Sequence, residues 1–92
     1  MKYLTKKKVS GMKVRYLGKS DPLELIHGKV YDVISIDSFF GLDDYAIVDE
    51  TGEDYLYPTD EFGIVQEGDV LETWEYEHDD EGYRTNTPPR KI

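Results

Sequence analysis

The sequence contains no cysteine, which excludes a disulfide framework and any zinc site built from thiolates. It contains no apolar run approaching the roughly 20 residues that a membrane-spanning helix needs. No apolar segment follows the basic residues near its start, as a secretory signal would require. These absences predict a cytoplasmic protein that has no membrane partner.

The sequence motifs of common enzymes are also lacking. There is no glycine-rich phosphate loop and no Ser-x-x-Lys, Gly-x-Ser-x-Gly or His-x-x-x-His pattern. The two histidines, His27 and His78, each stand in a predicted turn. The acids at 79–81 follow His78 and resemble a crude metal-binding loop, although acidic loops of this kind are more often simply solvated. We therefore expect no catalytic residue, no metal site and no cofactor.

Positive charge is concentrated at the two ends of the sequence. Residues 1–19 contain seven Lys and Arg and no acid, whereas residues 20–83 contain all 20 acids and one base, Lys29. A basic arm thus precedes an acidic body, and the net charge is −9. The body is expected to repel nucleic acid and to attract a basic protein or peptide. The alternative is that the acids simply keep a small protein in solution.

Ninety-two residues suffice for one domain with a modest core. The segment MKVRYL at 12–17 alternates apolar and basic residues, which predicts a half-buried strand. Residues 30–36 are apolar on both faces and predict a bent strand shared by two sheets. Phe39 lies in a predicted hairpin loop at 37–42, where it either caps the end of a barrel or is exposed for binding.

The stretch from Asp44 to Val65 reads as strand, turn, strand, one helical turn and a last strand. Gly52 supplies the positive φ of a hairpin turn, and Pro58 starts the helical turn. On the second strand Leu56 points away from its two tyrosine neighbours, and we expect the leucine to be buried and the tyrosines to face outward. The expected core residues of this stretch are Ile47, Leu56, Phe62 and Ile64.

The segments GKVYDVISI, at 28–36, and DYAIVDETGEDYLYPTDEFGIV, at 44–65, resemble small uncharacterised SH3-like barrel proteins of Gram-positive bacteria and their phages. The resemblance implies an all-β fold with a five-stranded SH3-like barrel over residues 12–66. It implies no established activity.

The remaining segments surround this predicted barrel. Residues 1–11 are expected to form a flexible basic arm, or alternatively an extra edge strand. Residues 67–85 predict an appended β-hairpin that packs Trp74 on the barrel, or else a short helix. Residues 86–92 predict a disordered tail.

The sequence departs from SH3 domains of the eukaryotic type, which bind proline-rich peptides. Those domains have an Ala-Leu-Tyr-x-Tyr strand and a tryptophan that opens the third strand, where this sequence has Val14–Leu17 and Asp44–Tyr45. Pro58 matches the proline of their helical turn, and Phe62 stands in for the aromatic residue after it. The two changes argue against recognition of proline-rich peptides.

The tyrosines carry the main functional hypothesis, a non-enzymatic binding module. An aromatic surface rimmed by acids suits a basic or proline-containing peptide, through stacking and charge. A purely structural role for the tyrosines is one alternative. Another is an acidic mimic of nucleic acid that inhibits a DNA- or RNA-binding protein. The oligomeric state does not follow from the sequence. The candidate binding residues are Tyr16, Phe39, Tyr45, Tyr55, Tyr57 and Pro58.

Overall fold

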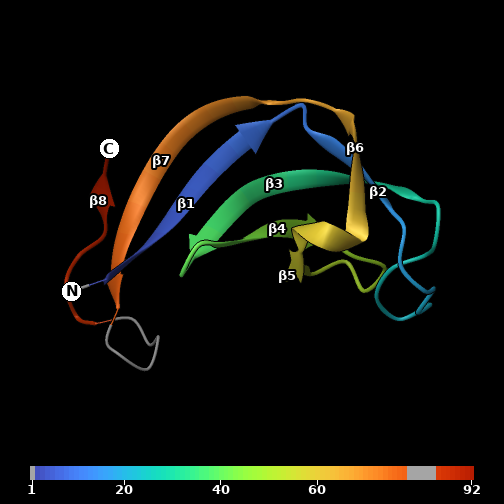
Figure 1. The fold of residues 1–92 in the computed structure, drawn as a ribbon, viewed down its shortest axis with the longest axis horizontal. Helices are drawn as coiled ribbons and strands as arrows, with labels where there is room; N and C mark the ends of the chain where they lie inside the picture. Colours follow the sequence, from blue (N-terminus) through green and yellow to red (C-terminus); the bar gives the residue numbers. More distant parts are fainter. Residues whose placement is uncertain (1, 79–84) are drawn as a thin grey trace.

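The protein is built from antiparallel β-strands, as a computed structural model that describes residues 2–78 and 85–92 shows (Figure 1). One short 3₁₀ turn, η1, joins two of the strands. The all-β prediction is therefore confirmed for the described residues. The elements are β1 Lys2–Ser10, β2 Lys13–Tyr16, β3 Val30–Phe39, β4 Leu42–Val48, β5 Asp54–Pro58, η1 Thr59–Glu61, β6 Phe62–Gln66, β7 Asp69–His78 and β8 Arg90–Lys91.

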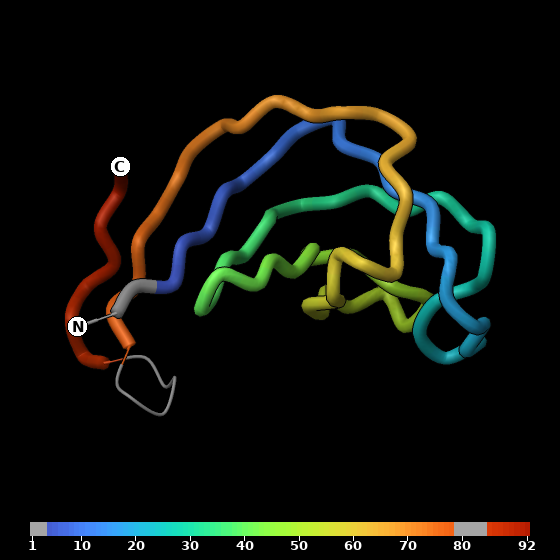
Figure 2. The backbone as a smooth tube through the Cα atoms, in the orientation of Figure 1, coloured from blue at the N-terminus to red at the C-terminus, as the bar shows by residue number. Residues whose placement is uncertain are grey.

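The strands form one curved sheet in the order β5-β4-β3-β1-β7-β8, and β2 pairs with both β3 and β6 (Figure 2). Strands β5 and β6 are not paired with each other in the described part of the chain, so the sheet is not closed into a barrel. This differs from the expected closed barrel of five strands. The sheet also has an extension that the expected barrel lacks, because β1 pairs with the second half of β3 and continues the sheet through β7.

Strand β3 is shared between two groups of strands, as its apolar residues on both faces predicted. Its first residues pair with β2, from Val30 to Asp32, and its later residues pair with β1, from Ser35 to Ser38. A bulge between Val33 and Ser35 interrupts the pairing with β4. A bulge shifts the alternation of side chains by one residue. Val33, which precedes the bulge, and Ile36, which follows it, can therefore both contact the core.

The basic N-terminal segment is strand β1, in the interior of the sheet. It pairs with β3 on one side and with β7 on the other, so the expectation of a flexible arm is wrong. Strand β7 is extended, and the alternative of a helix is wrong as well. The expectation of a disordered tail at 86–92 is wrong for Arg90–Lys91, which form β8 and pair with β7 at Trp74 and Glu75. The expected return strand near 83–85 falls largely outside the described residues.

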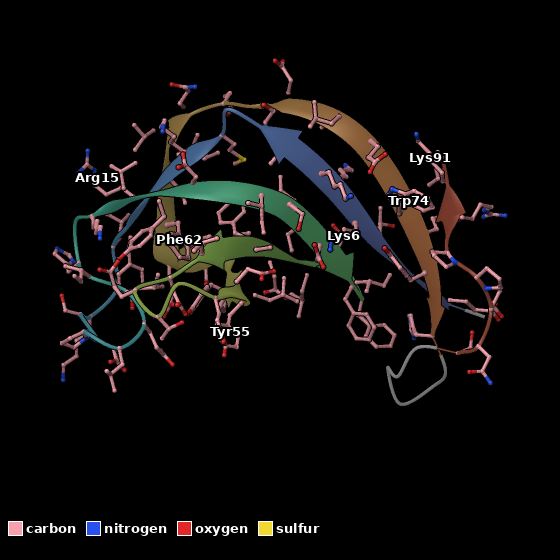
Figure 3. The ribbon with its side chains drawn as sticks, turned by 180° about the vertical axis from the view of Figure 1, so that it is seen from behind. Lys6, Arg15, Tyr55, Phe62, Trp74 and Lys91 are labelled. Carbon is pink, nitrogen blue, oxygen red and sulfur yellow. The ribbon has the colours of Figure 1, made fainter. Side chains whose placement is uncertain are left out.

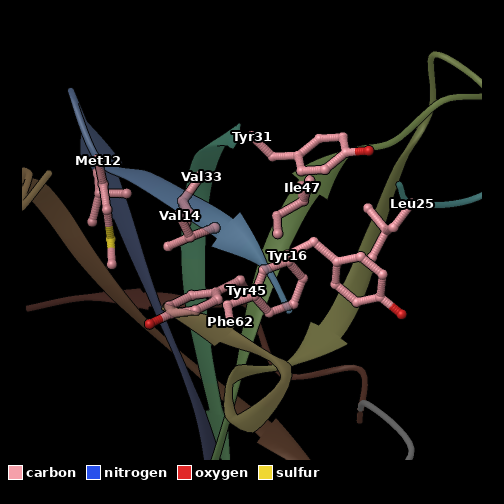
Figure 4. Close-up of a cluster of buried hydrophobic side chains, with 10 residues drawn as sticks. Met12, Val14, Tyr16, Leu25, Tyr31, Val33, Tyr45, Ile47 and Phe62 are labelled. Atoms are coloured by element: carbon pink, nitrogen blue, oxygen red, sulfur yellow. The ribbon is translucent and has the colours of Figure 1, made fainter. Parts of the chain in front are cut away.

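The core lies between β2, β6 and the paired strands β3 and β4 (Figure 4). Val14 and Ile47 have no exposed surface, and the ring of Phe62 lies 5.4 Å from that of Tyr16 and 5.7 Å from that of Tyr45. The expected burial of Ile47 and Phe62 is thus confirmed. The buried members of the core are Val9, Met12, Val14, Tyr16, Leu25, Tyr31, Val33, Tyr45, Ile47 and Phe62.

Two residues expected in the core are exposed instead. Leu56 pairs with Ala46 on the face of β5 opposite to the core, and about half of its surface is exposed. Ile64 lies on β6, an edge strand, and it stays exposed because the sheet does not close over it.

The turns follow local sequence signals closely. Gly52 has the expected positive φ, 85°, and η1 begins directly after Pro58 as expected. The hairpin between β3 and β4 is shorter than the expected loop at 37–42. Its two central residues, Phe40 and Gly41, have φ angles of 52° and 77°, the left-handed region that a two-residue hairpin turn of type I′ requires.

Candidate functional site

A groove lies between edge strand β5 and the loop that follows β2. The loop contributes Leu23 and Glu24, and β5 contributes two tyrosines with Leu56 between them. Tyr55 and Tyr57 share one side of this strand because successive residues of a strand alternate between its faces. We call this feature the Tyr55–Tyr57 groove. Its lining residues are Leu23, Glu24, Asp49, Thr51, Tyr55, Leu56 and Tyr57.

The floor of the groove is held by the carboxylate of Asp49, which is buried. It accepts a hydrogen bond of 2.9 Å from the backbone N–H of Thr51, one from the Thr51 hydroxyl, and one of 2.6 Å from the hydroxyl of Tyr57. Burial alone would raise the pKa of Asp49, but these hydrogen bonds outweigh it and lower the pKa below its usual range. Asp49 is therefore a carboxylate at neutral pH. Burial, together with the hydrogen bond to Asp49, raises the pKa of Tyr57, which stays a neutral donor.

The wall formed by the loop is attached to the β4–β5 turn by two contacts. The backbone N–H of Glu50 donates to the carbonyl of Glu24 over 2.9 Å, and Lys29 Nζ lies 2.8 Å from Glu50 Oε2. Tyr31 also donates its hydroxyl to Glu50 over 2.9 Å. The groove is therefore formed before any partner binds.

The open side of the groove combines aromatic surface with negative charge. Tyr55 is about half exposed and its hydroxyl donates to Glu53, while Leu23 is 75% exposed. The carboxylate of Glu24, which lines the groove, has no ion-pair partner among the described residues, and neither has that of Asp54, which precedes Tyr55 in the chain. An aromatic face beside free carboxylates favours a basic group, through cation–π contact and charge. Figure 3 shows Tyr55 at the outer edge of the sheet.

Two of the tyrosines predicted for this surface belong to the core. Tyr16 and Tyr45 are both more than nine-tenths buried, and their rings pack around Phe62. The hydroxyl of Tyr16 donates to the carbonyl of Lys19 over 2.9 Å, which lets a polar group be buried without loss of hydrogen bonding. Their assignment to a binding surface is wrong.

The other predicted residues divide between the groove and elsewhere. Tyr55 and Tyr57 are brought together, although Tyr57 is half-buried against the core rather than turned outward. Phe39 lies at the opposite end of β4, where its ring centroid is 4.6 Å from that of His78. Pro58 ends β5 and lines a separate hollow with residues 41–44 and 59–60.

The residues that the sequence analysis missed are Leu23 and Glu24. The one signal in the sequence was an apolar residue, Leu23, that directly follows a proline in a segment of turn residues. Leu25, from the same loop, is buried, so composition alone does not separate the two leucines.

The positive charge of β1 is opposed by acids on its neighbours. Lys8 Nζ lies 3.1 Å from one carboxylate oxygen of Glu72, and Lys91 Nζ lies 3.4 Å from the other. Lys6 stands in register between Asp37 of β3 and Trp74 of β7. Figure 3 shows Lys6, Trp74 and Lys91 in the half of the sheet away from Phe62. Of the β1 lysines, Lys8 thus forms an ion pair within the sheet, and Lys6 lies in register with the acid Asp37.

The ion pairs of Glu72 predict a loss of stability in acid. Hydrogen bonds from the side chains of Trp74 and Lys8, with a further one from Lys91, lower the pKa of Glu72 to about 2. In the unfolded chain the pKa of a glutamate is about 4.3. Because the pKa of Glu72 is lower in the folded protein, its ionised form stabilises the fold at pH values above about 4.3. That stability is lost as the pH falls from there toward 2. We expect Glu72→Gln to reduce the fall in the free energy of unfolding between pH 5 and pH 2, measured by urea titration at each pH.

The control is Glu67→Gln, which removes an exposed carboxylate from outside these ion pairs. It should retain the wild-type pH dependence. Equal pH profiles for Glu72→Gln and the wild type would contradict the role assigned to Glu72.

Comparison with known proteins identifies no relative. A scan against protein-family models, a search of curated proteins and a search of solved structures each give no match. Within residues 2–78 and 85–92, no helix has the length and apolar composition needed to cross a bilayer. In the same residues, no three His, Asp or Glu side chains are grouped so that they could hold a metal ion. The acids at 79–81, which resemble a metal-binding loop in the sequence, lie outside the described residues.

Proposed function

We propose that this protein is a non-enzymatic binding module whose Tyr55–Tyr57 groove holds a basic peptide segment of another protein. The observation that carries the proposal is the exposed ring of Tyr55 in one groove with the carboxylate of Glu24, which has no ion-pair partner among the described residues. Elsewhere on the described chain, Glu72 and Glu75 are paired with Lys or Arg. Other acids, such as Asp60 and Glu67, also have no ion-pair partner among the described residues, but the groove differs from these in its exposed aromatic ring. Carboxylates without a cation beside an aromatic ring favour a cationic partner.

The order of the strands gives further support. Strands β2 to β6 follow one another as in an SH3-like barrel, with η1 between the last two, and we assign the protein to this class of fold as part of the proposal. Peptide recognition on aromatic-lined grooves is a common use of SH3 domains. The changes at Val14–Leu17 and Asp44–Tyr45 argue against a proline-rich segment, and the carboxylate of Glu24 in the groove favours a basic one.

An acidic mimic of nucleic acid has less support. A mimic needs a continuous array of negative charge, whereas the lysines of β1 lie between β3 and β7, where Lys8 forms an ion pair with Glu72. Direct binding of nucleic acid is disfavoured by the net charge of −9.

The test uses three synthetic peptides of equal length that share one tyrosine and differ in carrying Lys, Gln or Glu at the other positions. We expect the Lys peptide to bind most tightly and to shift the amide resonances of Leu23, Glu24, Tyr55 and Tyr57 in NMR spectra of the labelled protein. Binding should weaken as salt is added. Tyr55→Ala should lower the affinity by about tenfold because it removes the exposed ring.

The matched variant is Leu42→Ala, which truncates an exposed apolar side chain at the other end of β4. It should bind as the wild type does. Equal affinity for the Lys and Glu peptides, or resonance shifts confined to other strands, would overturn the proposed function. A short DNA duplex, added at low salt, should cause no shifts.

A further inference from the structure

The outer edge of β5 is open. Strand β5 ends the sheet, and within the described residues its one partner strand is β4. The backbone N–H of Asp49 donates to the carbonyl of Glu53 over 3.1 Å, so these two residues form a hydrogen-bonded pair. This pair determines which of the following residue pairs of the hairpin are hydrogen-bonded. Hydrogen-bonded and non-hydrogen-bonded pairs alternate along an antiparallel ladder. Tyr55 and Tyr57 therefore direct their backbone N–H and C=O groups toward β4. Asp54 and Leu56 therefore present their N–H and C=O groups outward.

The position of Pro58 agrees with this alternation of hydrogen-bonded pairs. Proline has no N–H, and its place in the ladder is opposite Asp44, at a pair where an N–H would point away from β4. Asp54 is exposed and Leu56 is 52% exposed. The outward groups of these two residues are thus accessible to another backbone.

A hollow lies on each side of this edge. The Tyr55–Tyr57 groove lies on one face of β5, and a second hollow includes Lys6, Asp37 and Ala46. Tyr55 and Leu56 line both hollows. A strand added to β5 would direct alternate side chains to the two faces of the sheet, so each set of side chains would have a hollow to enter.

The charged residues around this edge indicate which kind of segment can bind there. Glu24 and Asp49 line the first hollow, Asp37 and Asp54 line the second, and the one base among all the lining residues is Lys6. A second copy of this protein is disfavoured, because its own β5 would bring another Glu53 and Asp54 to the same edge. Since Lys6 lies in the second hollow, basic side chains suit the first hollow and apolar ones suit the second.

We propose that the partner binds as an added β-strand on β5, through a segment in which basic and apolar residues alternate. This inference rests on the proposed function and states how its basic peptide is held. The N–H and C=O groups of Asp54 and Leu56 would form hydrogen bonds with the backbone of the segment. The two hollows would accommodate its alternate side chains and so determine specificity.

The first experiment uses a capped peptide of about six residues that alternates Lys and Val, a typical strand length. Two analogues carry N-methyl groups on alternate residues, one on the Lys set and the other on the Val set. In an added strand, one set of N–H groups faces β5 and the other faces solvent. We expect one analogue to lose affinity by more than about tenfold, as two lost hydrogen bonds imply, and the other to bind like the parent, as measured by calorimetry.

The second experiment changes the protein. Leu56→Pro removes the outward N–H at a position where an edge strand tolerates proline, and Leu56→Ala truncates the side chain but keeps the N–H. Affinity for the Lys-Val peptide should fall by about tenfold or more in Leu56→Pro relative to Leu56→Ala. Far-ultraviolet circular dichroism establishes that both variants are folded.

The outcomes separate this inference from the proposed function. If the Lys-Val peptide binds and both N-methylated analogues bind equally well, the added strand is overturned and the basic-peptide groove stands. If neither this peptide nor the Lys peptide binds, both proposals are overturned. If sedimentation shows a dimer that Leu56→Pro dissociates, β5 pairs with a second copy and the proposed occupant is wrong.

Discussion

Deleting residues 1–8 should release strand β7 from the sheet. In the described structure β7 pairs with β1 from Lys2↔His78 to Ser10↔Asp69, whereas its pairing with β8 involves Trp74 and Glu75. Without β1, the backbone groups of β7 lose their partners and the acid Glu72 loses Lys8. We expect the amide protection of residues 69–78 in hydrogen exchange to fall by about a hundredfold or more. Val9, a core residue, is retained in this variant.

The matched deletion removes residues 86–92, which contain β8. It should leave the protection of β7 largely intact, because the β1–β7 ladder remains. Persistent protection of β7 in the variant without residues 1–8 would show that β1 is dispensable and would restore the expectation of a flexible arm.

The second large effect is expected at Ile47. Its side chain is fully buried among the core residues, so Ile47→Ala removes apolar contacts and leaves a cavity. Substitutions of this kind cost about 2–5 kcal/mol. Leu56→Ala, on the opposite face of the neighbouring strand, should change stability by no more than about 0.5 kcal/mol. Urea unfolding of both variants measures the difference.

This pair of variants also tests which face of β5 is inside. Leu56 is expected in the core and the tyrosines outside, whereas the structure exposes Leu56 and packs Tyr57 against the core, with Tyr55 about half exposed. A cost for Leu56→Ala equal to that for Ile47→Ala would contradict the observed register.

Short-range signals predicted much of the fold correctly. Gly52 in its turn, the helical turn after Pro58 and the alternation of Met12, Val14 and Tyr16 each depend on a few adjacent residues. These features are set by backbone φ preferences and by the two-residue period of a strand. Sequence reasoning captures such effects because they need no distant partner.

The errors involve partners that are distant in the sequence. The lysines of β1 read as a solvated arm because their acidic neighbours on β3 and β7 are far along the chain. Leu56 was expected inside because it is the most apolar residue of its strand. Tyr57 takes the inner face instead, since Asp49 accepts its hydroxyl hydrogen bond there.

The candidate site was predictable in part for the same reason. Tyr55 and Tyr57 alternate within one strand, so sequence spacing alone puts them on one face. Leu23 and Glu24 come from a separate loop, whose position depends on the hydrogen bond between Glu50 and Glu24. Tyr16 and Tyr45 were misassigned because composition does not show which tyrosines surround Phe62.

The position of β1 also bears on how the chain folds. Strand β1 lies in the interior of the sheet, yet its neighbour β7 comes from the opposite end of the described sequence. The intervening chain must close into a loop before the first hydrogen bond of the β1–β7 ladder forms. The chain therefore loses conformational entropy before any contact of this ladder compensates for it. Topologies dominated by such non-local pairings have high contact order and fold in milliseconds to seconds, more slowly than helical proteins of similar stability. Until β7 arrives, the lysine-rich edge of β1 is exposed, and its positive charges oppose pairing with a second copy of itself.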